Sequence, residues 1–151
     1  MSTVIDIELI KPYSKPEEIA ELVAAFESCA LPREKWTHRA HLTVALWYLA
    51  RYDAAAAVEL IREGIQRFNR ARGIITTKTS GYHETITLFY ILIITKYLRE
   101  AGADAPLVEL LNNLLQRYGD KSLPLEYYSR ERLMSWEARK TWVAPDLKPL
   151  D

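Results

Sequence analysis

The stretch GYHETITLFYILIITKYLREAG, residues 81–102, decides the fold. Its apolar side chains recur at spacings of three and four, which is the period of one face of an α-helix. These side chains are Ile86, Phe89, Tyr90, Ile93 and Tyr97. Gly102 follows the last of them, and glycine commonly stands just beyond the end of a helix. The stretch therefore predicts a helix that begins at Ser80 or Gly81 and ends at Gly102.

The same signals predict four more helices on either side of this one. The first covers about residues 15–30, with Ser14 and Glu17 at the capping-box spacing and Pro16 in the first turn. The others begin at Thr37, at Asp53 and at Asp104, and the last two of these end at Gly73 and before Gly119. Gly64 lies inside the third helix, where glycine costs roughly 1 kcal/mol relative to Ala, and it predicts close packing there.

The remaining segments predict irregular structure and short helical turns. Residues 74–80 are rich in β-branched side chains and should be extended or irregular. Beyond Pro124, Ser129 and Ser135 can each cap a short helical segment. We therefore expect residues 1–151 to form one all-α domain, a compact bundle of four to five helices. The tail, residues 124–151, should wrap on that bundle.

Composition narrows the classes of function. The 151 residues are 49% hydrophobic, and 20 Lys plus Arg balance 20 Asp plus Glu. A neutral chain has no overall field that attracts nucleic acid, so we expect no nucleic-acid partner. The most apolar run, residues 86–94, is too short to span a bilayer, and we expect a cytoplasmic protein without membrane contact. An apolar helix face left over after packing would predict a homodimer.

The single cysteine points away from disulfide chemistry. Cys29 has no partner within the chain, so the fold does not depend on an internal disulfide. It follows Phe26 in an apolar part of the first predicted helix. A small buried side chain is therefore the favoured interpretation, and a catalytic thiol is the alternative.

The three histidines stand at the starts of two predicted helices. His38 and His41 are three residues apart and so share one face of the second helix, while His83 stands beside Glu84 at the start of the fourth. Imidazoles with a nearby carboxylate are typical ligands of zinc, iron and related divalent transition metals. One hypothesis is therefore a metal site formed by His38, His41 and His83, with catalysis at an open coordination position.

Two other interpretations of these residues remain open. In a metal-free site, His83 would be a general base, and Glu84 would be a second acid or would orient His38 or His41. In a structural interpretation, the paired histidines pack with Trp36 and hydrogen-bond helix ends, and Glu84 caps its own helix. Each pattern alone is weak. The metalloprotease motif His-Glu-x-x-His is absent, because the fifth position of the pattern that begins at His83 is Thr87.

Further polar residues gather near this centre and are candidate ligand contacts. Helix starts carry partial positive charge, so the two histidine-bearing starts could hold an anionic group instead of a metal. The tail mixes arginine and tryptophan, and it would either pack on the bundle or close over the histidines as a lid. The candidate ligand-binding residues are Arg39, Tyr82, Thr85, Thr87 and Arg139.

Three segments together resemble a known family. They are WTHRAHL (36–42), GYHETIT (81–87) and the ending YSRERLMSWEARKTWVAPDLKPL (128–150). The chain resembles, from about Leu31 to Leu150, a family of small bacterial helical proteins described as uncharacterised. The resemblance implies a single helical domain with functional positions at His38, His41, His83, Glu84, Thr85, Arg139 and Asp146. It implies no known activity.

Two hypotheses about function follow. The first is a small-molecule site between the starts of the second and fourth helices, with metal-dependent catalysis as one form of it. The second is a non-enzymatic helical module that binds a protein partner or an anionic ligand through the same polar cluster. A concave pocket that contains the histidines would favour the first, and an exposed apolar patch would favour the second.

Overall fold

The computed structural model describes residues 11–102 and 104–150, and these residues form helices and loops without strands. The all-α prediction is therefore confirmed. The longer helices are α2 (Pro16–Glu27), α3 (His38–Arg51), α4 (Ala54–Ala71), α5 (Glu84–Ala101) and α6 (Leu107–Tyr118). Shorter elements are η1 (Arg33–Lys35), η2 (Leu123–Glu126), α7 (Arg130–Leu133) and α8 (Trp136–Lys140). Within this part of the chain, no helix is long and apolar enough to cross a membrane.

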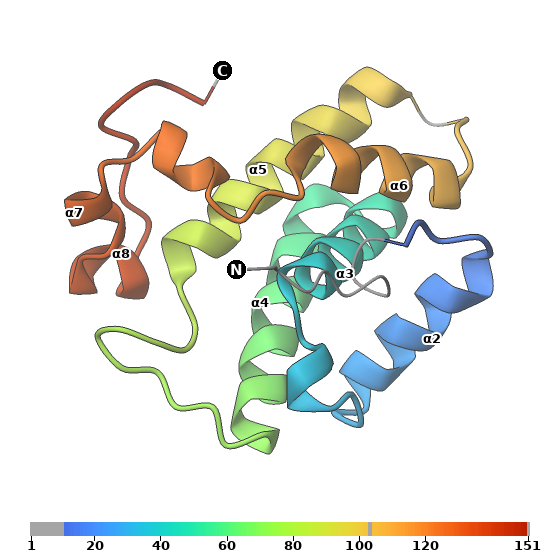
Figure 1. Ribbon diagram of the computed structural model, residues 1–151, viewed down its shortest axis with the longest axis horizontal. Helices are drawn as coiled ribbons and strands as arrows, with labels where there is room; N and C mark the ends of the chain where they lie inside the picture. The colour runs from blue at the N-terminus through green and yellow to red at the C-terminus, as the bar shows by residue number, and fades with distance from the viewer. Residues whose placement is uncertain (1–10, 103, 151) are drawn as a thin grey trace, which may run out of the picture.

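Helix α3 lies at the centre of the bundle (Figure 1). It packs against α2, α4, α5 and α6, so side chains on several of its faces are buried. Leu42, Val44, Leu46 and Tyr48 are among these core residues. Because α3 is surrounded by other helices, the polar residues at its start, His38, Arg39 and His41, are partly buried.

Four of the predicted helix caps are confirmed. In each, a side-chain oxygen accepts a hydrogen bond from the backbone N–H three residues later, which satisfies one of the free donors at a helix start. The capping residues are Thr37 for α3, Asp53 for α4, Ser129 for α7 and Ser135 for α8. These local signals fix where α3 begins and therefore where its two histidines lie.

The start of α2 differs from the predicted one by a single residue. Lys15 precedes the helix, and Glu18 rather than Glu17 reaches back to the chain. The Glu18 carboxylate accepts hydrogen bonds from the N–H groups of Ser14 and Lys15, at 2.8 and 2.9 Å. Pro16 occupies the first turn as predicted, and its fixed φ suits that position.

Two other helices begin later than predicted. Helix α5 begins after His83, because residues 74–83 first run as an irregular loop. Gly81 in that loop has φ +88°, and a Cβ there would lie 2.6 Å from the Cα of Thr76, so the turn requires glycine. Helix α6 begins after Pro106 rather than at Asp104, since Pro106 is still extended, with ψ 144°.

The glycine inside α4 does mark a close approach of two helices. A Cβ added to Gly64 would lie 2.9 Å from the ring of Phe26 on α2. The aromatic ring of Phe26 is completely buried and also stacks on Trp36, with ring centroids 4.7 Å apart. The cost of glycine within a helix is thus compensated by packing against an aromatic side chain.

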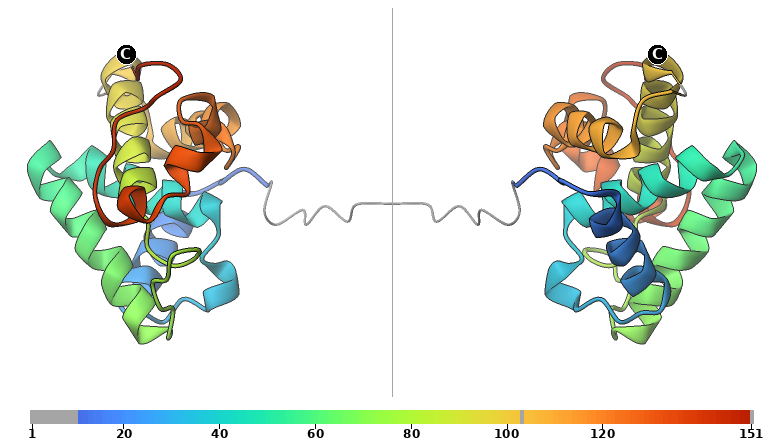
Figure 2. Two further views of the ribbon diagram at one scale, coloured as in Figure 1. Left: turned by 90° about the vertical axis from the view of Figure 1, so that its left-hand side faces the viewer. Right: turned by 90° about the vertical axis from the view of Figure 1, so that its right-hand side faces the viewer.

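The C-terminal segment runs along α5 (Figure 2). Helix α8 packs on α5, and the Tyr128 hydroxyl donates a 2.7 Å hydrogen bond to the carbonyl of Val143. The backbone N–H of Leu147 donates to the carbonyl of Tyr127 at 2.8 Å. These bonds tie the last described residues to the segment that precedes α7.

Candidate ligand-binding cavity

A cavity of about 460 Å³ lies where α3 and α5 begin. Its aliphatic lining comes from α3, α4, α5 and the loop before α5, namely Leu42, Ala45, Ile61, Ile65, Ile74, Ile86 and Ile91. Aromatic and polar side chains complete the wall, namely Trp36, His38, His41, Asn69, Tyr82, His83, Thr87, Tyr90 and Lys121. An apolar cavity of this size with a few polar groups is the usual form of a small-molecule site.

His38 lines this cavity, and one of its two ring nitrogens is unpaired. Its Nε2 atom is buried and has no hydrogen-bond partner. The ring lies beside Tyr90, with centroids 4.9 Å apart. Burial lowers the pKa of His38 below its usual range, although the backbone carbonyl of Tyr118 acts in the opposite direction. His38 is therefore neutral near pH 7, and its buried nitrogen is a polar group without a partner.

His41 is fixed in a single tautomer. Its Nδ1 atom lies 2.7 Å from the carbonyl oxygen of Thr37, and because a carbonyl can only accept, Nδ1 must carry the proton. The Nε2 atom of the neutral ring is then a hydrogen-bond acceptor. The ring packs on Trp36, with centroids 3.7 Å apart. Burial lowers the pKa of His41 to about 4, so the acceptor form persists at neutral pH.

His83 lines the same cavity, but both of its nitrogens have partners within the protein. Nε2 donates a 2.8 Å hydrogen bond to the carbonyl of Leu133, and Nδ1 accepts one from the N–H of Ile86 at 3.1 Å. The second bond caps α5. The predicted role of His83 as general base or metal ligand finds no support here, because neither nitrogen is available.

The predicted metal centre is not assembled by the three histidines. Across residues 11–102 and 104–150, no three His, Cys, Asp or Glu side chains are placed to hold a metal ion together. The paired spacing does bring His38 and His41 to one cavity, as expected. His83 points instead to the carbonyl of Leu133. Its hydrogen bond to that carbonyl occupies the nitrogen that a metal would need.

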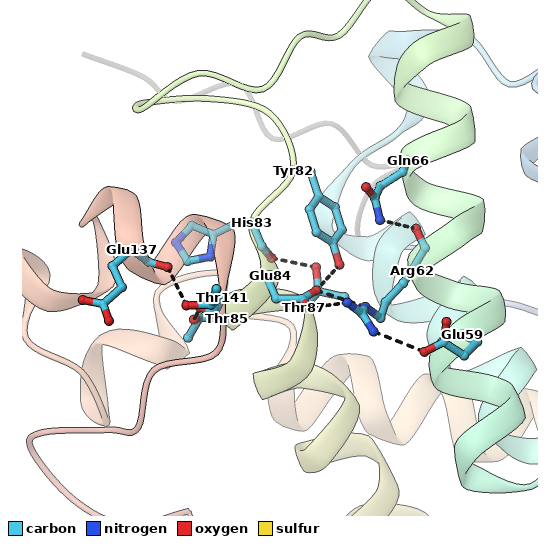
Figure 3. A network of polar contacts seen from close by, with 10 residues as sticks. All are labelled: Glu59, Arg62, Gln66, Tyr82, His83, Glu84, Thr85, Thr87, Glu137 and Thr141. Atoms are coloured by element: carbon cyan, nitrogen blue, oxygen red, sulfur yellow. Dashed lines mark hydrogen bonds and ion pairs between the residues drawn. The ribbon is translucent and has the colours of Figure 1, made fainter.

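Glu84 interacts with Arg62 of α4 rather than with a histidine (Figure 3). Its two carboxylate oxygens accept from Nε and Nη2 of Arg62 at 3.2 and 2.6 Å. The hydroxyl of Tyr82 donates to the same carboxylate at 2.6 Å. The expectation that Glu84 orients His38 or His41 is therefore wrong, and its bidentate pair joins α4 to the start of α5.

The two threonines near His83 also serve the fold. Thr87 lines the cavity, yet its hydroxyl donates to the carbonyl of His83 at 2.8 Å, a bond within its own helix (Figure 3). Thr85 donates to the carbonyl of Thr141 at 2.8 Å and accepts from the N–H of Val143 at 3.1 Å. Thr85 thus anchors the tail and does not line the cavity, contrary to its predicted role as a ligand contact.

The two predicted ligand-binding arginines lie outside the cavity wall. The guanidinium of Arg39 stacks on the ring of Tyr13 at 4.4 Å from its centroid. Arg139 is buried, and its Nη1 donates to the carbonyls of Gly81 and Tyr82 at 3.0 and 3.4 Å. Arg139 therefore holds the loop before α5 in place. It does not reach the space that a ligand would occupy.

The tail does not form a lid over the histidines. None of its described residues lines the cavity. Asp146 instead accepts hydrogen bonds from the N–H and hydroxyl of Ser129, at 2.7 and 2.6 Å, and so supports the start of α7. The interpretation of the tail as packing on the bundle agrees with these contacts better than a lid does.

Sequence reasoning missed Asn69 and Lys121. Asn69 is buried on α4, lines the cavity, and makes no side-chain hydrogen bond to another described residue. Its position four residues after Ile65 places a polar group on an apolar stripe, and this signal could have been found. Lys121 comes from the loop after α6, and nothing local in the sequence relates that loop to α3.

Comparisons of the chain with protein-family models, with curated proteins and with solved structures found no match. The resemblance to small bacterial helical proteins stays a prediction. The inference of function therefore depends on the side chains of the cavity.

Proposed function

We propose that this protein binds a small, mainly apolar molecule in the cavity at the starts of α3 and α5. The ligand carries a hydroxyl or another hydrogen-bond donor that meets the imidazole of His38 or His41. The observation that carries this proposal is the cavity of about 460 Å³, whose lining residue His38 has a buried Nε2 without a hydrogen-bond partner. A buried polar atom without a partner costs roughly 1–3 kcal/mol, and a bound ligand group would remove that cost.

The other polar groups support a ligand of the same chemistry. His41 presents an acceptor nitrogen because its Nδ1 proton is held by the carbonyl of Thr37. Asn69 adds an amide on the α4 side of the cavity. The aliphatic wall between these groups would bury an apolar body, at about 25 cal/mol for each Å² removed from water. A ligand with an apolar ring system and one polar substituent matches this distribution.

We propose binding and assign no catalytic role to His83 or Glu84. The polar atoms of both side chains are already engaged by Leu133, Ile86, Arg62 and Tyr82. A general base must be free to reach the proton that it removes. The geometry of His38 and His41 supports a role in binding the ligand, and we do not assign proton transfer to them.

A cavity-filling substitution tests the proposal, with 2-naphthol as the fluorescent probe. Ala45 lines the cavity on α3, whereas Ala50 is exposed on the same helix. We expect saturable one-site binding of 2-naphthol, weakened at least about tenfold in Ala45→Phe because the new ring occupies the space. The control Ala50→Phe adds the same ring outside the cavity and should bind like the parent.

The result that would refute the proposal is equally specific. If 2-naphthol does not bind the parent protein, or if Ala45→Phe and Ala50→Phe bind it equally well, the cavity is not the site. Circular dichroism of both variants shows whether each keeps the helical fold, so a loss of binding is not confused with unfolding.

A further inference from the structure

The cavity lies where the positive ends of two helices meet. Residues from the first turn of α3, His38 and His41, share its wall with Ile86 and Thr87 from the first turn of α5. The N–H groups of a first helical turn point out of the helix and carry a partial positive charge. Two such ends at one cavity favour a negatively charged group. The carboxylate of Glu84 does not offset this, since Arg62 pairs with it.

One charged side chain of the described residues lines this cavity, and it is a lysine. Lys121 is exposed, so it stands at the mouth, and it makes no ion pair with another described residue. The adjacent Asp120 does not line the cavity, and its carboxylate accepts from the N–H and hydroxyl of Ser122 at 2.9 and 2.7 Å. Lys121 is therefore the cation in the cavity wall, and the exposed carboxylate of Asp120, which raises the pKa of His38 and of Tyr90, lies near it outside the wall.

The number of cationic side chains in the cavity wall indicates which class of anion the cavity could bind. A phosphate group carries close to two negative charges and is usually held by several cationic or N–H donors. This cavity offers one lysine, and its remaining wall consists of aliphatic, aromatic and uncharged polar side chains. A single carboxylate on an apolar body matches that balance. The buried amide of Asn69 and the imidazoles lie beyond the entrance as partners for a second, uncharged substituent.

We infer that the ligand is an amphipathic monocarboxylate, with its carboxylate at Lys121 and its apolar body along Ile61 and Ile65. This inference rests on the proposed function, because it presumes that the cavity binds a small molecule. It adds the charge of the ligand and the direction in which the ligand enters. The acid group stays at the mouth, and the apolar body with its donor group goes in first.

A matched pair of probes tests the charge directly. The acid 6-hydroxy-2-naphthoate and its methyl ester share the ring system and the hydroxyl group and differ in charge. We expect the acid to bind about fivefold more tightly than the ester at low ionic strength, as a partly exposed ion pair near helix starts allows. Added salt should reduce this ratio, because screening weakens an interaction at the cavity mouth.

A lysine substitution locates the effect, and a second lysine serves as its control. In Lys121→Met the preference for the acid should fall to less than about twofold, because only the helix starts remain to favour the carboxylate. Lys148→Met removes the same charge from the tail, outside the cavity wall, and should keep the full preference for the acid. A preference that stays undiminished in Lys121→Met, or that falls equally in Lys148→Met, overturns the assignment.

The outcomes separate this inference from the proposed function. If 2-naphthol binds but the acid binds no better than its ester, the monocarboxylate inference is wrong and the proposed function stands. If 2-naphthol, the acid and the ester all fail to bind the parent protein, both are wrong.

Discussion

Two polar regions lie on either side of the first turn of α5, and they differ in how many of their polar atoms have hydrogen-bond partners. On the side of the tail, Thr85 bonds both Thr141 and Val143, and His83 bonds the carbonyl of Leu133. On the side of the cavity, the buried Nε2 of His38 has no partner. Both regions contain histidine near a helix start. The Nε of Arg139 on the tail side is also unpaired, but Arg139 does not line the cavity, whereas His38 does.

This difference distinguishes a structural polar group from one that is available for binding. Buried polar atoms in native proteins are almost always paired, so each pair on the tail side contributes to the stability of the fold. An unpaired atom beside a cavity costs stability when the cavity is empty. The comparison therefore predicts that substitutions on the tail side change stability, while those on the cavity side change binding.

The largest effect should come from His83→Ala. This substitution removes the cap of α5 and leaves the buried carbonyl of Leu133 without its donor. We expect the free energy of unfolding to fall by about 3 kcal/mol, from the lost cap together with the unsatisfied carbonyl. Urea unfolding followed by circular dichroism measures it. A loss below about 1 kcal/mol would show that the bonds of His83 contribute little to the fold.

A second effect, of similar size, should appear on acidification. Burial lowers the pKa of His41 from 6.5 to about 4 in the folded protein, so the unfolded chain binds its proton more readily. The contribution of neutral His41 is therefore complete above pH 6.5 and is lost as the pH falls toward 4. Between about pH 7 and about pH 4 we expect it to lower the free energy of unfolding by about 3 kcal/mol.

His41→Gln isolates this titration from that of other groups. The glutamine cannot be protonated, so the variant should lose about 3 kcal/mol less than the parent over the same pH interval. Burial also lowers the pKa values of His38 and His83, and those two residues remain in both proteins. Urea unfolding at the two pH values gives the difference. Equal losses in parent and variant would mean that His41 titrates normally in the folded state.

The parts of the fold that depend on neighbouring residues could be predicted from the sequence. The caps at Thr37, Asp53, Ser129 and Ser135 involve residues three apart, and all four are confirmed. The same short range placed His38 and His41 on one face of α3. The start of α5 was predicted too early, because the residues before His83 form a loop and not the first turn of the helix.

The partners of the charged side chains could not be predicted in this way. Glu84 pairs with Arg62, which is 22 residues away on another helix, and Arg139 bonds Gly81 across 58 residues. Both contacts depend on how the helices pack against one another, and the spacing of residues along the chain does not predict this packing. Two local signals in the sequence relate to the cavity, namely the paired spacing of His38 and His41 and the polar Asn69 on an apolar stripe.

The smallest change in stability should come from His38→Leu, on the cavity side of the comparison. Leucine has a similar volume and removes a buried nitrogen that has no partner, so we expect the free energy of unfolding to change by less than about 1 kcal/mol. Binding of 2-naphthol should nevertheless weaken about fivefold, which is the value of one ordinary hydrogen bond. Thr85→Val, measured alongside, should show the opposite pattern, with a larger loss of stability and little change in affinity, because Thr85 bonds Thr141 and Val143 and does not line the cavity. If His38→Leu lost as much stability as Thr85→Val, His38 would be a structural residue, and the distinction between the two sides of α5 would disappear.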